Sequence, residues 1–309
     1  MKKFIIYGVG NKGKLIYDYL KQLGYSDCVY AFCDKNAGTI GTYADKSVYT
    51  FSELSEMDLP YLNTVSNTKD VNEMLKENKK KIIGSTVSEL ATYLGTDRVA
   101  FNREFCAFYH INEMDDYFEV AENALDTFWS EDSPFYQMFK ELDLDNVIEL
   151  ACGRGRHVPK YIDQANHITL VDILDKNIDY CQQRFSNYSK ISYYRNDGYD
   201  LKELETAKYS ALFAYDAMVH FELIDIYSYM NDIYRVLVNG GYALIHHSNM
   251  TSDYKMSFEK AGNPGGRNYM SKELFAYIAY RAGFDIIEQK IIDWSLPNMD
   301  CISLVRKPL

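Results

Sequence analysis

Residues 147–156 read VIELACGRGR, and this stretch decides the fold of the C-terminal part of the chain. A short apolar run ends in a glycine-rich turn, which is typical of a buried parallel strand that passes into a helix. Glu149 stands at the strand end, within the turn. A carboxylate there would repel a pyrophosphate at close range but would pair well with an ammonium group. The turn therefore favours a ligand with a positive charge.

The residues around this turn predict a second α/β series. The last two apolar runs are joined by only seven residues, 293–299, which is too few for a crossover helix and predicts an antiparallel hairpin. Helices are expected between most of the other strands. The expected strands are 146–150, 167–171, 191–195, 209–215, 241–247, 284–292 and 300–306.

Two further carboxylates follow expected strands. Asp172 ends the second strand, where an acid can accept hydrogen bonds from both ribose hydroxyls. Asp197 follows the third strand, where an adenine amino group could lie. S-adenosylmethionine carries an α-ammonium and a sulfonium, so these acids and Glu149 suit it better than NAD. The alternative is that all three acids only cap helices.

Five segments of residues 140–309 resemble class I S-adenosylmethionine-dependent methyltransferases: ELACGRGR, LVDI, NDG, AYDAMVHFE and RVLVNGGYALIHHSN. The resemblance implies a seven-stranded sheet of order 3-2-1-4-5-7-6 and S-adenosylmethionine as the cofactor. Ala151 and Arg156 stand where many members have glycine, which puts the first loop turn in doubt. The predicted cofactor-binding residues are Glu149, Ala151, Gly153, Gly155, Asp172, Ile173, Asp197, Gly198 and Tyr215.

The acceptor of the methyl group is expected at the ends of the fourth and fifth strands, because ligands of open α/β sheets bind outside the carboxyl ends of the strands. A hydroxyl acceptor gains from a positioned base, most often histidine. The base candidates are His220 and one of His246 and His247, since consecutive strand residues face opposite sides. Asp216 would orient an imidazole or the acceptor. The alternative for each histidine is a structural role.

Two other residues are predicted to bind substrate. Arg267 lies in the glycine-rich segment 262–268 and could hold an anionic group such as phosphate; an exposed, solvated arginine is the alternative. Asn249 follows the fifth strand. No metal site is predicted, although Asp216 and the histidines leave a divalent metal conceivable.

The N-terminal part contains a second glycine loop between a strand and a helix. Gly8, Gly10 and Gly13 form GxGxxG, and Asp34 lies 21 residues after Gly13. Such a loop suits a nucleotide phosphate at a helix N-terminus, or it is needed only for packing. Strands are expected at 3–9, 28–33, 61–65 and 81–83, and helices at 12–23, near 69–78 and from Ser88 to Gly95, as in half of a doubly wound fold.

IIYGVGNKG and AFCDKN in this part resemble the Rossmann-like domain found ahead of sugar-modifying acyltransferases and some methyltransferases. That resemblance implies a link to sugar nucleotides. We therefore expect an α/β protein with two Rossmann-like domains. Residues 1–110 would form the nucleotide-binding-type domain, 111–142 a helical linker or lid containing Phe128 and Trp129, and 143–309 the methyltransferase domain.

Composition narrows the class of protein further. Apolar residues make up 47% and charged residues 25% of the chain, as in soluble globular proteins, and no apolar stretch approaches the length of a membrane span. Residues 1–110 carry 14 basic and 13 acidic side chains, and residues 111–309 carry 19 and 31. The acidic C-terminal part argues against nucleic acid as a partner. Six cysteines without a CxxC pair indicate reduced thiols, and we expect a cytoplasmic protein.

The sequence thus predicts an S-adenosylmethionine-dependent methyltransferase that acts on a hydroxyl or amine of a small polar acceptor. A sugar, nucleotide-sugar or phosphorylated carbohydrate intermediate is the favoured acceptor, which would make the protein an enzyme of carbohydrate modification. One alternative is a bifunctional protein with an NAD-dependent N-terminal oxidoreductase domain. Another is a non-catalytic nucleotide-sugar binding module. The number of chains in the assembly stays open.

Overall fold

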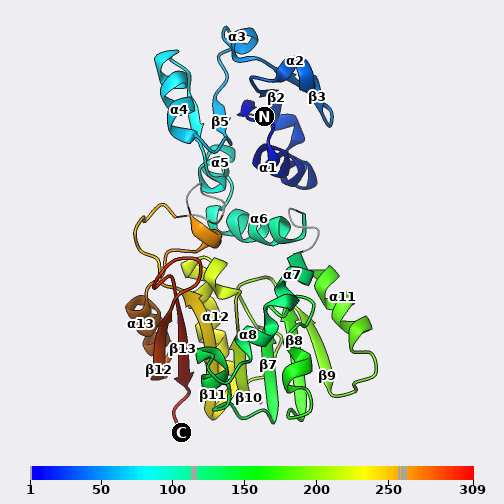
Figure 1. The fold of residues 1–309 in the computed structure, drawn as a ribbon, viewed down its shortest axis with the longest axis vertical. Coiled ribbons are helices and arrows are strands. Elements are labelled where there is room, and N and C mark those ends of the chain that lie inside the picture. The colour runs from blue at the N-terminus through cyan, green and yellow to red at the C-terminus, as the bar shows by residue number, and fades with distance from the viewer. Residues whose placement is uncertain (1, 113–116, 257, 259–262) are drawn as a thin grey trace. The chain divides into compact units, whose positions relative to one another are not determined.

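The computed structural model describes residues 2–112, 117–256, 258 and 263–309, which fold into two compact units (Figure 1). Unit 1 comprises Met1–Asp115 and Ser257–Asn263. Unit 2 comprises Asp116–Met256 and Pro264–Leu309. Each unit is an α/β fold around its own mixed sheet.

The sheet of unit 1 has six strands in the order β3-β4-β2-β1-β5-β6. All its pairs are parallel except β3 with β4, which is antiparallel. The strands are β1 (Phe4–Tyr7), β2 (Val29–Cys33), β3 (Thr42–Tyr43), β4 (Lys46–Tyr49), β5 (Tyr61–Asn63) and β6 (Ile82–Gly84). The helices are α1 (Asn11–Gln22), the 3-10 helix η1 (Ser26–Cys28), α2 (Ala37–Ile40), α3 (Phe51–Leu54), α4 (Thr68–Glu77), α5 (Val87–Leu94) and α6 (Arg98–Asn112).

The expected strands and helices of unit 1 are present, and the structure adds elements that the sequence did not predict. The short strands β3 and β4 extend the sheet at one edge beyond β2. Helix α6 was missed because polar residues interrupt its apolar face, and only Phe101 and Phe105, four positions apart, are buried in it. Helix α5 ends at Gly95, as predicted, with this glycine in the left-handed conformation at φ +81°.

The sheet of unit 2 has seven strands in the order β12-β13-β11-β10-β7-β8-β9. Strands β11, β10, β7, β8 and β9 are parallel, and β13 runs antiparallel to both β11 and β12. Numbered along the chain within this unit, the order is 3-2-1-4-5-7-6, as the methyltransferase resemblance implies, and the terminal hairpin is confirmed. The strands are β7 (Asn146–Leu150), β8 (His167–Asp172), β9 (Ile191–Arg195), β10 (Tyr209–Ala214), β11 (Leu237–Ser248), β12 (Asp285–Ile292) and β13 (Asp300–Arg306).

Helices cover both faces of this sheet, and two apolar clusters separate them from it. Helices α12 and α13 pack on one face, whereas α9, α10 and α11 contribute to the cluster on the other face. The helices of unit 2 are α7 (Tyr117–Asn123), α8 (Leu125–Phe128), α9 (Pro134–Phe139), α10 (Val158–Tyr161), α11 (Asp175–Arg184), η2 (Met218–His220), α12 (Leu223–Val236), η3 (Pro264–Gly266) and α13 (Lys272–Ala282).

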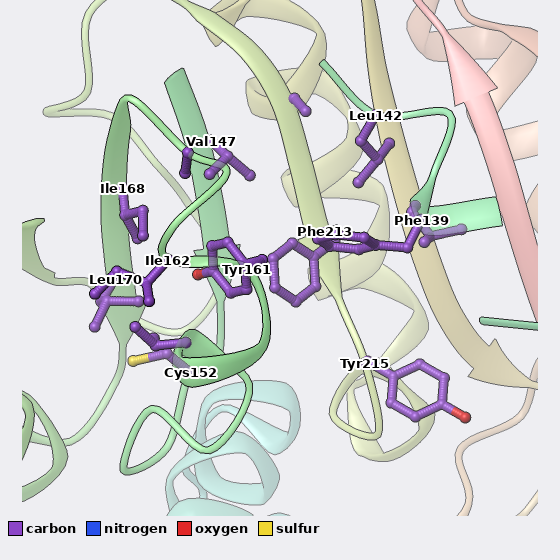
Figure 2. Packing of buried hydrophobic residues seen from close by; sticks show 14 of the residues in the cluster. Phe139, Leu142, Val147, Cys152, Tyr161, Ile162, Ile168, Leu170, Phe213 and Tyr215 are labelled. Carbon is purple, nitrogen blue, oxygen red and sulfur yellow. The ribbon is translucent and has the colours of Figure 1, made fainter. Parts of the chain in front are cut away.

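Side chains of strand β10 alternate between the two apolar clusters on the two faces of the sheet. Phe213 and Tyr215 belong to the cluster with α9 and α10, whereas Leu212 and Ala214 belong to the cluster with α12 and α13, as the two-residue period of a strand requires. Figure 2 shows the first cluster, with the Phe213 ring between those of Tyr161 and Phe139. This packing fixes the strand ends from which the polar side chains of the site project.

Candidate active site

The glycine-rich turn after β7 is built from left-handed backbone positions. Ala151, Gly153 and Gly155 have φ of +56°, +55° and +71°. A Cβ atom on Gly155 would stand 2.5 Å from Cε2 of Phe185, so only glycine fits there. Ala151 adopts the left-handed conformation with a methyl group, at a cost of roughly 1–2 kcal/mol. Its departure from the usual glycine therefore leaves the turn in place.

Glu149 lies under this turn and is 2% exposed. One carboxylate oxygen, Oε2, accepts a hydrogen bond of 2.8 Å from the Tyr161 hydroxyl. The other oxygen, Oε1, is buried with no hydrogen-bond partner among the described residues. Burial raises the pKa of Glu149 to about 8. A buried acceptor that lacks a donor is costly, and a cationic donor at this position would satisfy it.

Asp172, the last residue of β8, accepts hydrogen bonds from the turn after β7 and from the turn after β8. Its Oδ2 accepts from the Gly153 N–H at 2.9 Å, and its Oδ1 accepts from the Leu174 N–H at 2.9 Å and from Asn177 Nδ2 at 3.1 Å. Burial raises the pKa of Asp172 to about 6, although these hydrogen bonds favour its charged form. Ile173, which is half-buried, follows it directly.

Asp197 stands after β9 with its side chain 39% exposed. Ion pairs with Lys202 and, at 3.1 Å, with Arg195 hold it, and the hydrogen bond from Lys202 is the main cause that lowers its pKa. The turn around it is fixed by the buried Asn196, whose Oδ1 accepts from the Gly198 N–H at 3.3 Å. The three predicted acids thus stand at the carboxyl ends of three adjacent strands, Glu149 and Asp172 as late residues of β7 and β8 and Asp197 just after β9.

A chain of polar contacts runs along the ends of β10, β11 and β13. Arg156 Nη2 pairs with Asp216 Oδ2 at 3.0 Å, and the Asp216 N–H donates to His246 Nδ1 at 3.1 Å. His246 Nε2 lies 3.2 Å from Asp300 Oδ2, and Arg267 pairs with Asp300 through Nε at 3.0 Å and Nη2 at 2.6 Å. Burial alone would raise the pKa of Asp300, but the hydrogen bonds from His246 and Arg267 hold it below its usual value.

The three candidate histidines occupy different environments. His246 and His247 are fully buried and lie on opposite faces of the sheet: His246 packs against Tyr215, and His247 stacks on Phe275 of α13. His247 contacts the Ser248 carbonyl through Nδ1 and Ser303 Oγ through Nε2, and burial lowers its pKa to about 3. Both histidines therefore have both ring nitrogens engaged.

His220, at the end of η2, is only partly buried. Its Nδ1 lies 3.0 Å from the Gly266 carbonyl oxygen, which can only accept. That contact selects the tautomer in which Nδ1 carries the proton, so the basic lone pair is on Nε2. Of the three histidines, His220 is thus the one that is not fully buried.

The predicted substrate residues have structural partners. Arg267 is only 2% exposed and lies 5.4 Å from the ring centroid of Trp294, so it is not the solvated arginine of the alternative prediction. Asn249 donates to the Asn298 carbonyl and accepts from the backbone N–H of Lys272, the first residue of α13.

Aromatic rings line the same strand ends. Tyr215 packs edge-on against Phe128 at 5.0 Å, and Phe128 stacks on Trp294 at 5.4 Å. Figure 2 shows the Tyr215 hydroxyl pointing away from the Tyr161–Phe213 packing. Trp129 packs instead against Phe139 and donates from Nε1 to a ring nitrogen of His157. Phe128, unlike Trp129, therefore packs among the aromatic rings at these strand ends.

The glycine loop of unit 1 is internally bonded. Asp34 accepts from the Val9 N–H at 3.0 Å and from the Asn36 N–H at 2.9 Å, and a Cβ on Gly13 would stand 2.1 Å from the Gly8 carbonyl oxygen. Gly10 is the N-cap residue of α1 and, as a glycine, has no side chain that could accept a hydrogen bond from the first turn of the helix. Lys12 reaches the Ser85 carbonyl at 2.9 Å. These contacts support the packing interpretation of the loop and leave its ligand untested.

Within the described ranges, no group of three or more His, Cys, Asp or Glu side chains is arranged to hold a metal ion. No helix in the same part of the chain combines the length and apolar character of a membrane span.

Comparison with known proteins supports the assignment of unit 2. A family described as "Methyltransferase domain" matches residues 147–241, which run from β7 into β11. No curated protein matches the chain.

Solved structures show the same fold. The magnesium protoporphyrin IX methyltransferase (ChlM) of Synechocystis PCC 6803, with bound SAH, matches with a TM-score of 0.50 and 13% identity, over 67% of this chain and 99% of that chain. An S-adenosylmethionine-dependent methyltransferase of Mesorhizobium loti matches with a TM-score of 0.47 and 13% identity, over 56% of this chain and 97% of that chain.

Residues 147–241 thus match a methyltransferase domain, and unit 2 has the fold of methyltransferases that use S-adenosylmethionine. The residues present fit this cofactor, because Glu149 offers its ammonium a buried oxygen in need of a donor. Neither the non-catalytic alternative nor the NAD-dependent alternative is favoured.

Proposed function

We propose that the protein transfers a methyl group to a hydroxyl or amine of a small polar acceptor, with His220 as the base. The observation that carries this proposal is the state of the three histidines: His246 and His247 are fully buried, whereas His220 is partly exposed and has Nδ1 on a carbonyl oxygen.

We assign the cofactor to the turn after β7 and the ends of β8 and β9. Glu149 Oε1 would accept from the ammonium, Asp172 would face the ribose, and Asp197 would lie near the adenine amino group. Gly153 and Gly155 let the backbone approach closely. S-adenosylmethionine, when bound there, would supply a methyl group on a sulfonium sulfur, which leaves as a neutral thioether. The chain then has to supply binding, orientation and proton removal.

His220 would remove the acceptor proton through Nε2, while the Gly266 carbonyl keeps the ring in the required tautomer. Asp216 would contact the acceptor from the end of β10. His246 is a positioning residue in this scheme, because it holds the Asp216 backbone, which is in the left-handed conformation at φ +55°. Arg156 balances the charge of Asp216 across a contact of 3.0 Å.

For the acceptor we favour a sugar, nucleotide-sugar or phosphorylated carbohydrate intermediate. The support comes from unit 1, whose strand, GxGxxG loop and Asp34 resemble the Rossmann-like domain of sugar-modifying enzymes. Within unit 1, Gly8, Gly10 and Gly13 at the N-terminus of α1 suit the phosphates of a nucleotide. The polar groups Asp216 and His220 suit a hydroxyl-bearing acceptor.

The test is transfer of a labelled methyl group from S-adenosylmethionine to a panel of acceptors, read by mass spectrometry. The panel contains nucleotide-sugars, free sugars, sugar phosphates and, as a contrast, catechols and apolar amines. We expect a mass gain of one methyl group on a member of the carbohydrate set. Methylation confined to the contrast set would overturn the acceptor class, although the methyltransferase assignment would stand.

A further inference from the structure

Strand β12 is one edge of the seven-stranded sheet (Figure 1). Within the described part of the chain it pairs only with β13, from Asp285↔Arg306 to Ile292↔Asp300. An edge strand presents a row of backbone N–H and C=O groups that can pair with another strand. The eight residues of β12 are long enough for such pairing.

The side chains around this edge are unusually apolar for a surface. Ile286, Ile287 and Ile291 of β12 are 37%, 44% and 39% exposed. On α13, which packs beside β12, Tyr277 and Tyr280 are 61% and 70% exposed. We call these five residues the edge patch. Isolated exposed apolar residues are ordinary, but three exposed isoleucines within one eight-residue edge strand make this strand a candidate for pairing.

Residues 286–292 of β12, IIEQKII, are complementary to themselves in one antiparallel register, in which Asp285 lies opposite Asp293, beyond the end of the strand. With a two-fold axis through Gln289, Glu288 lies opposite Lys290 of a second copy, and Lys290 lies opposite its Glu288. Further out, Ile287 meets Ile291 and Ile286 meets Ile292. Opposite charges and apolar pairs across strands are stabilising.

The neighbouring registers lack this match. An axis through Glu288 or through Lys290 sets like charges directly against each other. An axis midway between Glu288 and Gln289 places Lys290 opposite Ile287, and an axis midway between Gln289 and Lys290 places Glu288 opposite Ile291. Of the registers compared, only the one centred on Gln289 places Glu288 opposite Lys290 and Lys290 opposite Glu288 of the second copy.

We propose that β12 pairs antiparallel with β12 of a second copy of this chain, in the register centred on Gln289, and joins two sheets into one. Lysines and bulges commonly protect edge strands, and β12 has both: Lys290, and a shift of the β13 pairing between Ile286 and Glu288. Lys290 would repel most strands, but a second copy offers it Glu288. The surface therefore selects its own copy as the partner.

Sedimentation velocity over a concentration series tests the proposal on the full chain. We expect a species of twice the 35.9 kDa chain mass. Glu288→Lys and Lys290→Glu each create two like-charge pairs and should weaken the dimer about tenfold or more. The double variant exchanges the charges and should restore wild-type association. Asp179→Lys, an exposed reversal on α11, is the control and should leave association unchanged.

A wild-type monomer at every concentration up to about 100 µM would overturn the proposal. A dimer that withstands both single variants, or a double variant that stays as weak as the singles, would overturn it as well. Thermal melting checks that each variant is folded.

A cysteine on the axis gives a second readout. In Gln289→Cys the two thiols would face each other across the two-fold axis, at the Cα separation of directly opposite residues, about 4.5–5.5 Å, which a disulfide can span. Mild oxidation with oxidised glutathione removes two protons and two electrons and should give a covalent dimer. Tyr188→Cys, an exposed site after α11, should not form one. Equal crosslinking of the two variants would contradict the register.

Discussion

Glu149→Gln tests whether the buried carboxylate receives the cofactor ammonium. The pKa of Glu149 is about 8 because the side chain is buried, so ionising it at pH 7 costs about 1.4 kcal/mol, one pKa unit. An ammonium at Oε1 favours the ionised form. Cofactor binding therefore releases a proton, and S-adenosylmethionine affinity should rise by about ninefold from pH 6 to pH 7 and by about fivefold from pH 7 to pH 8.

In the Gln variant this pH dependence should vanish, because the amide does not titrate. At pH 8 the variant should bind about 10–100-fold more weakly, since a hydrogen bond to a charged group is worth roughly 1.5–3 kcal/mol. Isothermal titration calorimetry in two buffers of different ionisation enthalpy should show release of about 0.9 proton by the wild type at pH 7. The matched ligand is 5′-methylthioadenosine, which lacks the amino-acid end.

The affinity of the protein for 5′-methylthioadenosine should depend on neither pH nor the side chain at residue 149. Equal pH profiles for the wild type and the variant, or an affinity that falls from pH 6 to pH 8, would refute the pairing. The free protein gives an independent check. Because the folded-state pKa of Glu149 is raised, its stabilising contribution is present below about pH 4.5 and is lost as pH rises to about 8. The unfolding free energy should therefore change less with pH in the Gln variant than in the wild type.

Three further predictions concern the acceptor side and the turn. His220→Ala should lower kcat by about 10²–10⁴-fold with little change in the S-adenosylhomocysteine Kd; full turnover would remove His220 as the base. Asp300→Asn should cost about 3–5 kcal/mol in denaturant unfolding, because it removes the carboxylate that neutralises the buried Arg267, and adding Arg267→Met should recover part of it. No recovery would mean that the pair is not the cause. Gly155→Ala should destabilise by about 1–3 kcal/mol more than Gly153→Ala, because only the former drives a Cβ into Phe185; equal melting temperatures would contradict this.

The strands could be predicted from the sequence because their cause is local. Runs such as Phe4–Tyr7 are continuously apolar between turns, which favours burial on both faces and hence a parallel sheet. The same logic placed Glu149, Asp172 and Asp197 at strand ends. It also put His246 and His247 on opposite faces, since strand periodicity needs no tertiary information.

The partners of these residues could not be predicted in the same way. Asp300 meets His246 only because β13 pairs with β11, 54 positions away in the chain. Tyr161 reaches Glu149 from α10, on the neighbouring helix layer. Arg267 was predicted to hold an anionic substrate group, and its ion pair with the buried Asp300 depends on a residue 33 positions away. Each of these contacts depends on a long-range register that a single sequence does not encode locally.

A crystal structure with S-adenosylhomocysteine bound measures the cofactor placement most directly. We expect its amino group within about 3 Å of Glu149 Oε1, its ribose beside Asp172 and its adenine near Asp197. Adenine or a diphosphate against Glu149, or ligand density in unit 1 alone, would contradict this placement.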